Sequence, residues 1–380
     1  MLAHFAHHLL SALLIPLLPF IRDDLNLDYT QAGWLVSAFT LTYGISHLPA
    51  GWLVDRLGAR LMIMIGISGA SLAGLFIGLS PNYWVMMIFL VLLGITGGGY
   101  HPAAAPLITA SVEPRRGGWA LGLHQIGGTG SHFLAPLIAV AIAAFLKWRG
   151  AFIALSFPTI AFGLMLYVIL GKRAQRDSVV RQNVVKATVQ DPTSHSSSKR
   201  LIAFLLLTTI GHTLINAVIS FVPLFVVDNY KVSQEGAAFL LALVYSAGLW
   251  AGPLGGYLSD RLGRVPVILA ASLLAGPIIY LLNVASYGWA TTLVLSGIGM
   301  SLYMRMPVSE AYIIRNTPQR HRGTMLGIYY FGSRGGPGIF TPVLGNMIDH
   351  FGFTTSFTIT ATIMAGVALI ATIFLWGRQD

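Results

Sequence analysis

Two stretches of the chain read Gly51-Trp-Leu-Val-Asp55-Arg56-Leu-Gly58-Ala-Arg60 and Gly256-Tyr-Leu-Ser-Asp260-Arg261-Leu-Gly263-Arg264. We call them the two signature loops. They lie 205 residues apart (256 − 51), and each separates two apolar runs. Three further pairs keep the same offset of 205 residues: His7 with His212, Gly122 with Gly327, and Gly127 with Gly332. Matches that stay in register over this much of the chain predict two similar halves.

The composition around these loops is that of a membrane protein. Of the 380 residues, 55% are hydrophobic and only 9% are charged, whereas a soluble domain carries about 25% charged residues. Apolar segments of about 20 residues can cross a bilayer as helices, which pair their backbone polar groups internally. We expect twelve such helices, at 3–21, 30–54, 61–79, 83–110, 118–145, 150–171, 201–227, 235–258, 265–284, 288–314, 324–348 and 354–377.

The N-terminal segment does not have the pattern of a cleavable signal peptide, because no basic region precedes its apolar run. We interpret it as the first span. Either this span has no cytoplasmic tail before it, or the natural start lies upstream of Met1.

The Lys and Arg residues predict the orientation in the membrane. Of the 23, 17 fall in one set of loops and four in the opposite set, which are Arg22, Lys147, Arg149 and Lys231. Because basic loops stay in the cytoplasm, we expect a multi-pass protein of a bacterial inner membrane with both termini cytoplasmic. The net charge of +10 is then explained by orientation, and we expect no nucleic-acid partner.

Residues 172–200 form the only long polar stretch and are rich in Ser, Gln, Lys and Arg. That composition is typical of a linker. The expected domains are therefore an N-terminal six-helix bundle over 1–171, a cytoplasmic linker over 172–200, and a C-terminal six-helix bundle over 201–380. Six-helix halves in parallel repeat are a recurring plan for carriers that rock around a central site.

With a signature loop between the second and third spans and its echo between the eighth and ninth, the chain resembles the major facilitator superfamily along its whole length. The resemblance implies an all-α membrane fold of twelve helices in two pseudo-symmetric six-helix bundles. Two further stretches resemble the fosmidomycin-resistance branch of bacterial carriers, namely Gly97-Gly-Gly-Tyr100-His101-Pro102-Ala-Ala and Gly122-Leu-His124-Gln125-Ile-Gly127-Gly128.

The resemblance also implies that the signature loops latch the two halves in one state and release them in the other. The glycines would let helices approach closely, and Asp55 can face the N-terminal end of a neighbouring helix, where negative charge is favoured. The simpler interpretation is that the arginines only anchor the topology. The expected latch residues are Gly51, Asp55, Arg56, Gly58, Arg60, Gly256, Asp260, Arg261, Gly263 and Arg264.

Three charged residues lie inside expected spans, where a charge is costly and usually faces a cavity. Arg305 and Glu310 lie in the tenth span and Arg334 near the middle of the eleventh. The resemblance implies that the first, fourth, seventh and tenth helices line the cavity, so we expect Arg305 to point inward. Two arginines against one glutamate favour an anion, which a guanidinium binds through forked donors. The structural alternatives pair Glu310 with Arg261 or Arg264, and Arg334 with backbone carbonyls.

Eight of the eleven histidines also fall inside expected spans. An imidazole can carry a proton or bond a substrate near neutral pH, although a hydrogen bond between helices is the simpler role for any one of them. The expected substrate-binding residues are Tyr100, His101, His124, Gln125, His212, Asn216, Arg305, Tyr329, Tyr330 and Arg334. The residues expected to couple protons are Glu310, His101 and His124.

Several classes of site are not supported by the sequence. No carboxylate lies among the histidines and their spacing is not a sharp ligand pattern, so we expect no metal site. No phosphate-binding loop is present for ATP. The spans hold no nucleophile–base pair and no paired carboxylates, which argues against an enzyme. We expect no cofactor, and a monomer whose partners are its substrate, membrane lipid and, where transport is coupled, protons.

These observations predict a secondary active transporter that moves a small anionic or polar organic molecule by alternating access. Export of a drug or a phosphonate is one form of this hypothesis. Two alternatives stay open: a proton-independent uniporter or exchanger for organic-anion uptake, and, from another class, a channel or receptor that uses the same fold.

Overall fold

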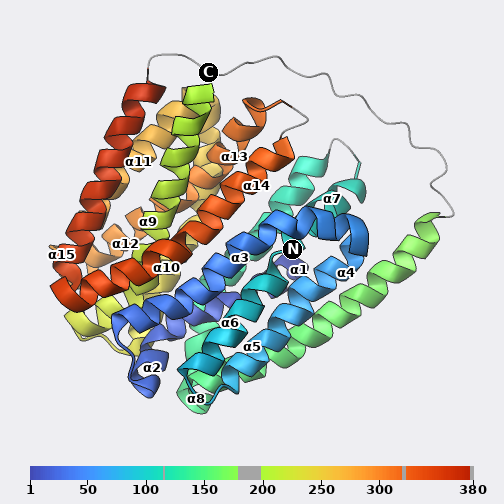
Figure 1. The fold of residues 1–380 in the computed structure, drawn as a ribbon, viewed down its shortest axis with the longest axis horizontal. Coiled ribbons are helices and arrows are strands. Elements are labelled where there is room, and N and C mark those ends of the chain that lie inside the picture. The colour runs from blue at the N-terminus through green and yellow to red at the C-terminus, as the bar shows by residue number, and fades with distance from the viewer. Residues whose placement is uncertain (114–115, 179–197, 319–321, 377–380) are drawn as a thin grey trace.

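A computed structural model describes residues 1–113, 116–178, 198–318 and 322–376. The described residues form helices joined by short turns (Figure 1). The helices are α1 (Leu2–Leu9), η1 (Ser11–Leu13), α2 (Leu14–Leu25), α3 (Tyr29–Leu57), α4 (Ala59–Met64), η2 (Ile65–Gly69), α5 (Ala70–Gly78), α6 (Tyr83–Gly97), α7 (Tyr100–Ala110), α8 (Gly117–Ser178), α9 (Ser198–Tyr230), α10 (Gln234–Leu262), α11 (Arg264–Leu281), α12 (Trp289–Tyr303), α13 (Arg305–Arg315), α14 (Arg322–Tyr330), η5 (Phe331–Gly335) and α15 (Gly336–Leu375).

The lengths of these helices suit a membrane protein. Seven helices in the described ranges are long and apolar enough to cross a bilayer, or eight if the bent pair Leu2–Leu9 and Ser11–Leu25 is counted as one span. α8 and α15 each contain two helices joined at a residue with positive φ, Lys147 and Gly352. With these breaks counted, the helices are consistent with the twelve expected spans, and the expected all-α membrane fold is confirmed.

Several spans are interrupted near their middle. The first bends by 52° between α1 and the η1–α2 segment. The third and the eleventh contain the π-helical turns η2 and η5. A π turn leaves backbone carbonyls available to other partners and is common at functional sites. These interruptions place polar backbone and side chains inside the bundle rather than against lipid.

The glycines of the signature loops differ from their expected role. Gly58 (φ +82°) and Gly263 (φ +90°) end α3 and α10 with a backbone conformation that favours glycine. Gly51 and Gly256 have open space where a Cβ would lie. The expected close approach of helices at these glycines is therefore absent in this structure. The backbone turn explains why glycine stands at positions 58 and 263, and nothing in the structure explains Gly51 and Gly256.

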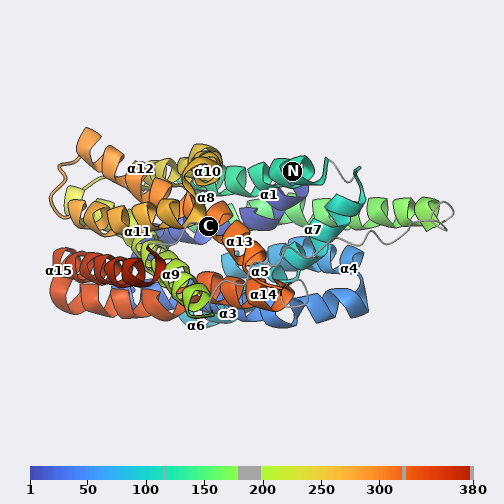
Figure 2. The same ribbon diagram turned by 90° about the horizontal axis from the view of Figure 1, so that it is seen from above.

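The two parts of the chain lie side by side. In Figure 1 most of α1 to α8, coloured blue to mid-green, lies on one side, and most of α9 to α15, coloured lime green to red, lies on the other. Seen from above (Figure 2), α10 and α12 lie toward one face of the molecule, and α3 and α15 lie toward the other. α3 packs against α15, and α8 packs against α10, so both contacts join the first part of the chain to the second. The linker expected over 172–200 begins later, because α8 continues to Ser178, and 179–197 lie outside the described residues.

The outer surface is strongly apolar. Large side chains such as Phe145, Trp84 and Trp289 are 88%, 73% and 84% exposed. In water such a surface would drive association, whereas lipid solvates it. The two tryptophans begin α6 and α12 at helix ends, where aromatic side chains favour the membrane–water interface.

Candidate functional site

A cavity of about 410 Å³ lies between the two parts of the chain. α1, α7 and α8 contribute side chains from the first part, and α10, α12, α13 and η5 contribute from the second. This volume falls in the range of small-molecule sites. The polar lining residues are His4, His8, His101, Gln125, Thr129, His132, Tyr303, Glu310 and Arg334. Four of the residues expected from the sequence therefore meet in one place: His101, Gln125, Glu310 and Arg334.

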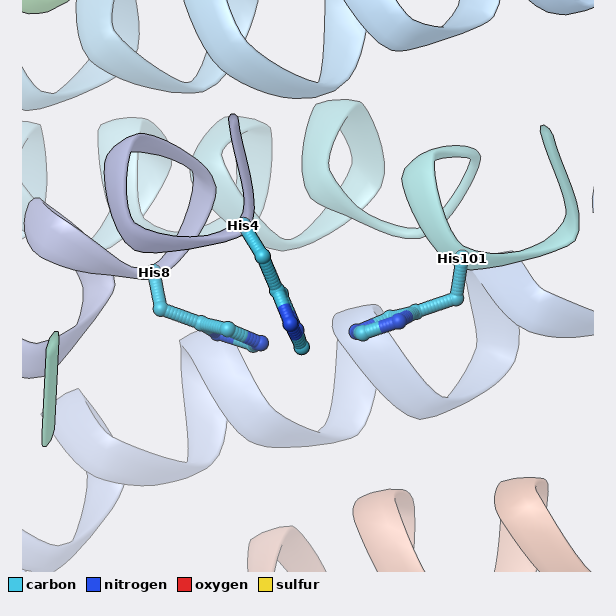
Figure 3. Close-up of side chains that lie close together, drawn as sticks. All are labelled: His4, His8 and His101. Atoms are coloured by element: carbon cyan, nitrogen blue, oxygen red, sulfur yellow. The ribbon is translucent and has the colours of Figure 1, made fainter. Parts of the chain in front are cut away.

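One wall of the cavity is made of imidazoles. We call His4, His8, His101 and His132 the histidine wall. The ring centroid of His4 lies 4.9 Å from that of His8 and 5.0 Å from that of His101, and His8 lies 4.8 Å from His132. His4 and His8 are one turn apart on α1, and Figure 3 shows both rings turned toward His101 on α7. Neutral imidazoles can pack this closely, whereas charged ones would repel each other.

Backbone carbonyls hold the rings of α1 in place. Nδ1 of His4 lies 2.9 Å from the carbonyl oxygen of His124, and Nδ1 of His7 lies 2.8 Å from that of Gly66 in η2. Each contact places the ring proton on Nδ1, because a carbonyl only accepts. A Cβ at Gly128 would lie 2.5 Å from the His4 ring, so a glycine is required there.

The opposite wall carries the charges. Arg334 lies in the π turn η5, Glu310 in α13 and Tyr303 at the end of α12. Within the described ranges, Arg334 forms no ion pair and no hydrogen bond. Glu310 likewise has no ion pair with a described arginine, so the pairing with Arg261 or Arg264 does not occur here. Its carboxylate instead accepts a hydrogen bond from the Tyr330 side chain. The guanidinium and the carboxylate both line the cavity, where a ligand can reach them.

Arg305 does not line this cavity. The side chain is 4% exposed and points into the second part of the chain, where Nη2 donates hydrogen bonds to the carbonyl oxygens of Leu207 (3.0 Å) and Thr208 (3.4 Å). A Cβ at Gly211 would lie 2.3 Å from Nη1, so this glycine leaves room for the guanidinium. Arg305 therefore ties α13 to α9, and the lining side chains carry one positive and one negative charge rather than a positive surplus.

The other expected binding residues are also buried away from the cavity lining. Tyr100 is fully buried and stacks on His7 with the ring centroids 4.2 Å apart. His124 stacks on His4 at the same centroid distance. His212 is 9% exposed, and its carbonyl accepts a hydrogen bond from Asn216 Nδ2 (2.9 Å). Tyr329 is 4% exposed and lies in an apolar cluster. These side chains support the walls and do not form the lining itself.

The signature loops make few contacts in this structure. Asp55 and Asp260 are exposed, and no described basic residue pairs with either. Arg56 and Arg261 lie over the rings of Trp52 (4.3 Å) and Tyr257 (4.7 Å), both on their own helices. Arg60 donates from Nε to the carbonyl of Tyr167 (2.7 Å), and Arg264 begins α11. No contact between these loops holds the two parts of the chain together here.

The end of the molecule away from the signature loops is joined tightly. Arg22 forms a two-pronged ion pair with Asp228, and the Tyr29 hydroxyl donates to the same carboxylate (2.6 Å). Asp349 accepts from the backbone N–H groups of Tyr29 (3.0 Å) and Thr30 (2.8 Å). We call this the closed end. These bonds all cross from the first part of the chain to the second.

Glycines allow the two parts of the chain to approach closely where α3 meets η5 and α15. At Gly33, Gly44 and Gly338 an added Cβ would lie within 3.0 Å of backbone in the opposite part of the chain. At Gly51, Gly122 and Gly256, near the signature loops, it would meet nothing within 4 Å. We call the end of the molecule that carries the signature loops the open end. The cavity lining extends from His4 and His8 to Gly122 and Gly256, so the cavity reaches toward the open end.

Some functional side chains were not among the expected site residues. His4, His8, His132 and Tyr303 line the cavity. The spacing of His4 and His8 by one helical turn is the signal that could have identified those two. In the sequence, nothing distinguishes Arg22, Asp228 and Asp349 from other charged residues between the expected spans. Only the packing of distant helices shows that they close one end.

Comparisons with known proteins agree with this architecture. The family model described as the Major Facilitator Superfamily matches residues 1–248 and 204–380. The chain belongs to the Major Facilitator Superfamily, and it is a membrane transporter rather than an enzyme. The chain is similar to multidrug resistance protein MdtG of Enterobacter lignolyticus (strain SCF1), with 24% identity over 93% of this chain and 85% of that protein. It is also similar to the uncharacterized MFS-type transporter YceJ of Bacillus subtilis (strain 168), with 26% identity over 97% and 93%.

Solved structures share the fold. A bacterial homolog of the human lysosomal transporter Spinster, in an inward-facing and unoccupied conformation, aligns with a TM-score of 0.72 at 17% identity, over 98% of this chain and 94% of that one. A POT family transporter in complex with 5-aminolevulinic acid aligns with a TM-score of 0.77 at 13% identity, over the same shares of the two chains. At these identities the likeness establishes the fold alone.

Proposed function

We propose that the chain is a secondary active transporter of the bacterial inner membrane that moves a small anionic or polar organic molecule by alternating access. One observation supports this most strongly: Arg334 lines the cavity together with Glu310, yet its guanidinium makes no hydrogen bond and no ion pair within 4.0 Å with a described residue. An unpaired guanidinium within a membrane span is costly, and an anionic group that enters the cavity would offset that cost. A carboxylate or phosphonate matches its forked donors.

The two ends of the molecule support a carrier over a channel. A channel needs a continuous path, whereas here the cavity reaches one end only and the other is sealed by ion pairs and backbone contacts. In our proposal the two domains, 1–171 and 201–380, rock around the cavity, and the signature loops latch the halves in the opposite state. Both termini lie in the cytoplasm, so the open end faces the cytoplasm, and the monomer is the working unit.

Coupling to protons is part of the proposal. Glu310 and the histidine wall, which includes His101, line the cavity and can exchange protons with water. His124 contributes through its carbonyl, which holds His4. Export of a drug or phosphonate is one form of the proposal, favoured by similarity to proteins named for multidrug resistance. Uptake of an organic anion by a uniporter or exchanger would use the same cavity.

A ligand-stabilisation screen of the purified protein tests the anion site. Organic anions, phosphonates and neutral drugs are compared by the rise in melting temperature that each produces. We expect an anionic hit whose affinity falls by about 10- to 100-fold in Arg334→Ala, because a charge-assisted hydrogen bond contributes about 1.5–3 kcal/mol. Arg334→Lys should recover only part of this loss, since lysine lacks the fork.

The matched control is Arg315→Ala, which removes an exposed arginine from α13 outside the cavity lining. Its ligand response should equal that of the unaltered chain. An anionic hit that stabilises Arg334→Ala and the unaltered chain equally would overturn the anion site. Flux into vesicles that does not saturate and shows no counterflow would instead support a channel.

A further inference from the structure

We propose that His4, His8 and His101 form a binding site for a divalent first-row transition metal ion such as Zn²⁺, Co²⁺ or Ni²⁺. The sequence predicts no metal site, because no carboxylate lies among the histidines and their spacing is not a sharp ligand pattern. The fold brings the three together on the histidine wall (Figure 3). The inference goes beyond the proposed transport of an organic molecule and does not depend on it.

The geometry is close to that of a bound metal. The candidate ligand nitrogens of the three histidines lie within 4.8 Å of one another. Around a tetrahedral zinc ion with Zn–N distances of about 2.0–2.1 Å, ligand nitrogens lie about 3.4 Å apart. Small rotations of the side chains about their χ angles would close this gap. The backbone already supports the arrangement, because His4 and His8 share one face of α1 and His101 lies in the first turn of α7.

The lone pairs that a metal requires are available. His4 donates from Nδ1 to the carbonyl of His124, so its Nε2 carries the free lone pair. Nε2 of His4 and Nε2 of His101 are both buried, and neither has a hydrogen-bond partner in the part of the chain that the structure describes. Buried polar atoms without partners cost free energy. A metal ion between the rings would satisfy both nitrogens at once.

The surroundings of His4 resemble those of known metal ligands. Metal-binding histidines usually donate their second ring N–H to a carbonyl or carboxylate, which fixes the ring and its tautomer. The His124 carbonyl does this for His4, and Gly128 leaves the space that the ring needs. The histidine is 2% exposed, so it is held in this orientation by packing as well as by the hydrogen bond.

The donor set selects the class of ion. Neutral imidazoles favour zinc, copper, nickel and cobalt, whereas magnesium and calcium require oxygen ligands. Three protein ligands leave at least one coordination position open, as in sites that bind an exogenous ligand. That position faces the cavity, because all three histidines line it. Arg334 lines the same cavity and repels a cation, whereas Glu310 attracts it, so the imidazoles set most of the affinity.

Titration with Co²⁺ tests the site directly, using tag-free protein in detergent so that no added histidine competes. Four-coordinate Co²⁺ gives strong visible absorption that the hydrated ion lacks. We expect saturable absorption at one ion per chain, displaced by Zn²⁺. His8→Asn and His101→Asn should each weaken binding by at least tenfold. His350→Asn, an exposed histidine on α15 outside the cavity lining, should bind like the unaltered chain.

Each result of the Co²⁺ titration either supports or overturns the metal site. Absence of a saturable signal in the unaltered, monodisperse protein overturns the site, and this result does not depend on whether any variant folds. A signal that persists in His101→Asn, or that disappears in His350→Asn, shows that the ion lies elsewhere and also overturns it. None of these measurements uses transport, so the metal site can fail while the anion site at Arg334 stands, and the reverse also holds.

Discussion

The closed end and the open end are built from the same repeated chain, yet they use their polar residues in opposite ways. At the closed end, Arg22 pairs with Asp228 and Asp349 accepts from two backbone N–H groups across the two parts. At the open end, Asp55 and Asp260 are exposed without an ion pair to any described residue. In this conformation, only the charges at the closed end bond the two parts of the chain together. We infer that the charges at the open end do so in the alternate conformation.

Substitution of a glycine at the contact between the two parts should have the largest effect on stability. Gly44 and Gly51 lie two turns apart on α3, but a Cβ at Gly44 would lie 2.5 Å from the backbone of Gly335, whereas one at Gly51 meets nothing. An alanine at position 44 would push the two backbones apart and should lower the free energy of unfolding by about 1–3 kcal/mol, as overpacking does. We expect Gly44→Ala to lower the melting temperature of the purified protein and to reduce transport at least tenfold.

Gly51→Ala is the matched control for Gly44→Ala, because it adds the same methyl group to the same helix. Its melting temperature should stay within about a degree of the unaltered value, since surface changes usually fall within about 0.5 kcal/mol. Equal destabilisation by the two substitutions would show that the two positions are packed alike, contrary to the structure.

A smaller effect is expected when the ion pair at the closed end is broken. Asp228 holds both Arg22 and the Tyr29 hydroxyl, and its side chain is 26% exposed. Asp228→Asn should therefore destabilise this conformation by about 1–2 kcal/mol, less than the loss of a fully buried pair. The measurement is thermal unfolding at two salt concentrations. Asp260→Asn, the control at the open end, should leave the midpoint unchanged at both.

The smallest effect on stability is expected at the signature loop itself. Asp55 is exposed and pairs with no described basic residue, so Asp55→Asn should change the melting temperature by less than about a degree. Transport by the same variant should nevertheless fall at least tenfold, because in our proposal the loop latches the halves in the alternate state. Normal transport by Asp55→Asn, measured with confirmed membrane insertion, would show that the loop only anchors topology.

Much of the fold could be predicted from the sequence, because local patterns determine it. Apolar runs of the right length predict spans, and the repeat of Asp55-Arg56 as Asp260-Arg261 predicts two related halves. The lengths of α9, α10 and α11 agree with the expected spans. The two π turns were not expected, since no simple residue pattern marks them.

The site was predicted only in part, and the reason is the rotation of each helix about its axis. Arg334 and Glu310 were identified as charges inside spans, and both line the cavity. Arg305 has the same sequence signal but points to α9, where Gly211 leaves space for its guanidinium. Spacing along one helix cannot show which neighbour a side chain meets. For the same reason the meeting of His101 with α1 could not be foreseen.

The central claim is that the cavity opens toward the signature loops and that this end faces the cytoplasm. The chain has no cysteine, so single cysteines can be introduced without background. Gly252 lines the cavity, and a Cβ there would meet only the carbonyl of Tyr303 at 3.9 Å. Ser37 is 2% exposed at the closed end, where it donates to the carbonyl of Gly338.

The decisive measurement is labelling of Gly252→Cys and Ser37→Cys with a membrane-impermeant maleimide, in right-side-out and inverted vesicles. The account predicts that Gly252→Cys reacts rapidly in inverted vesicles and slowly in right-side-out ones, whereas Ser37→Cys reacts slowly in both. Rapid labelling of Gly252→Cys from the periplasmic side alone, or of Ser37→Cys from that side in the absence of substrate, would contradict it.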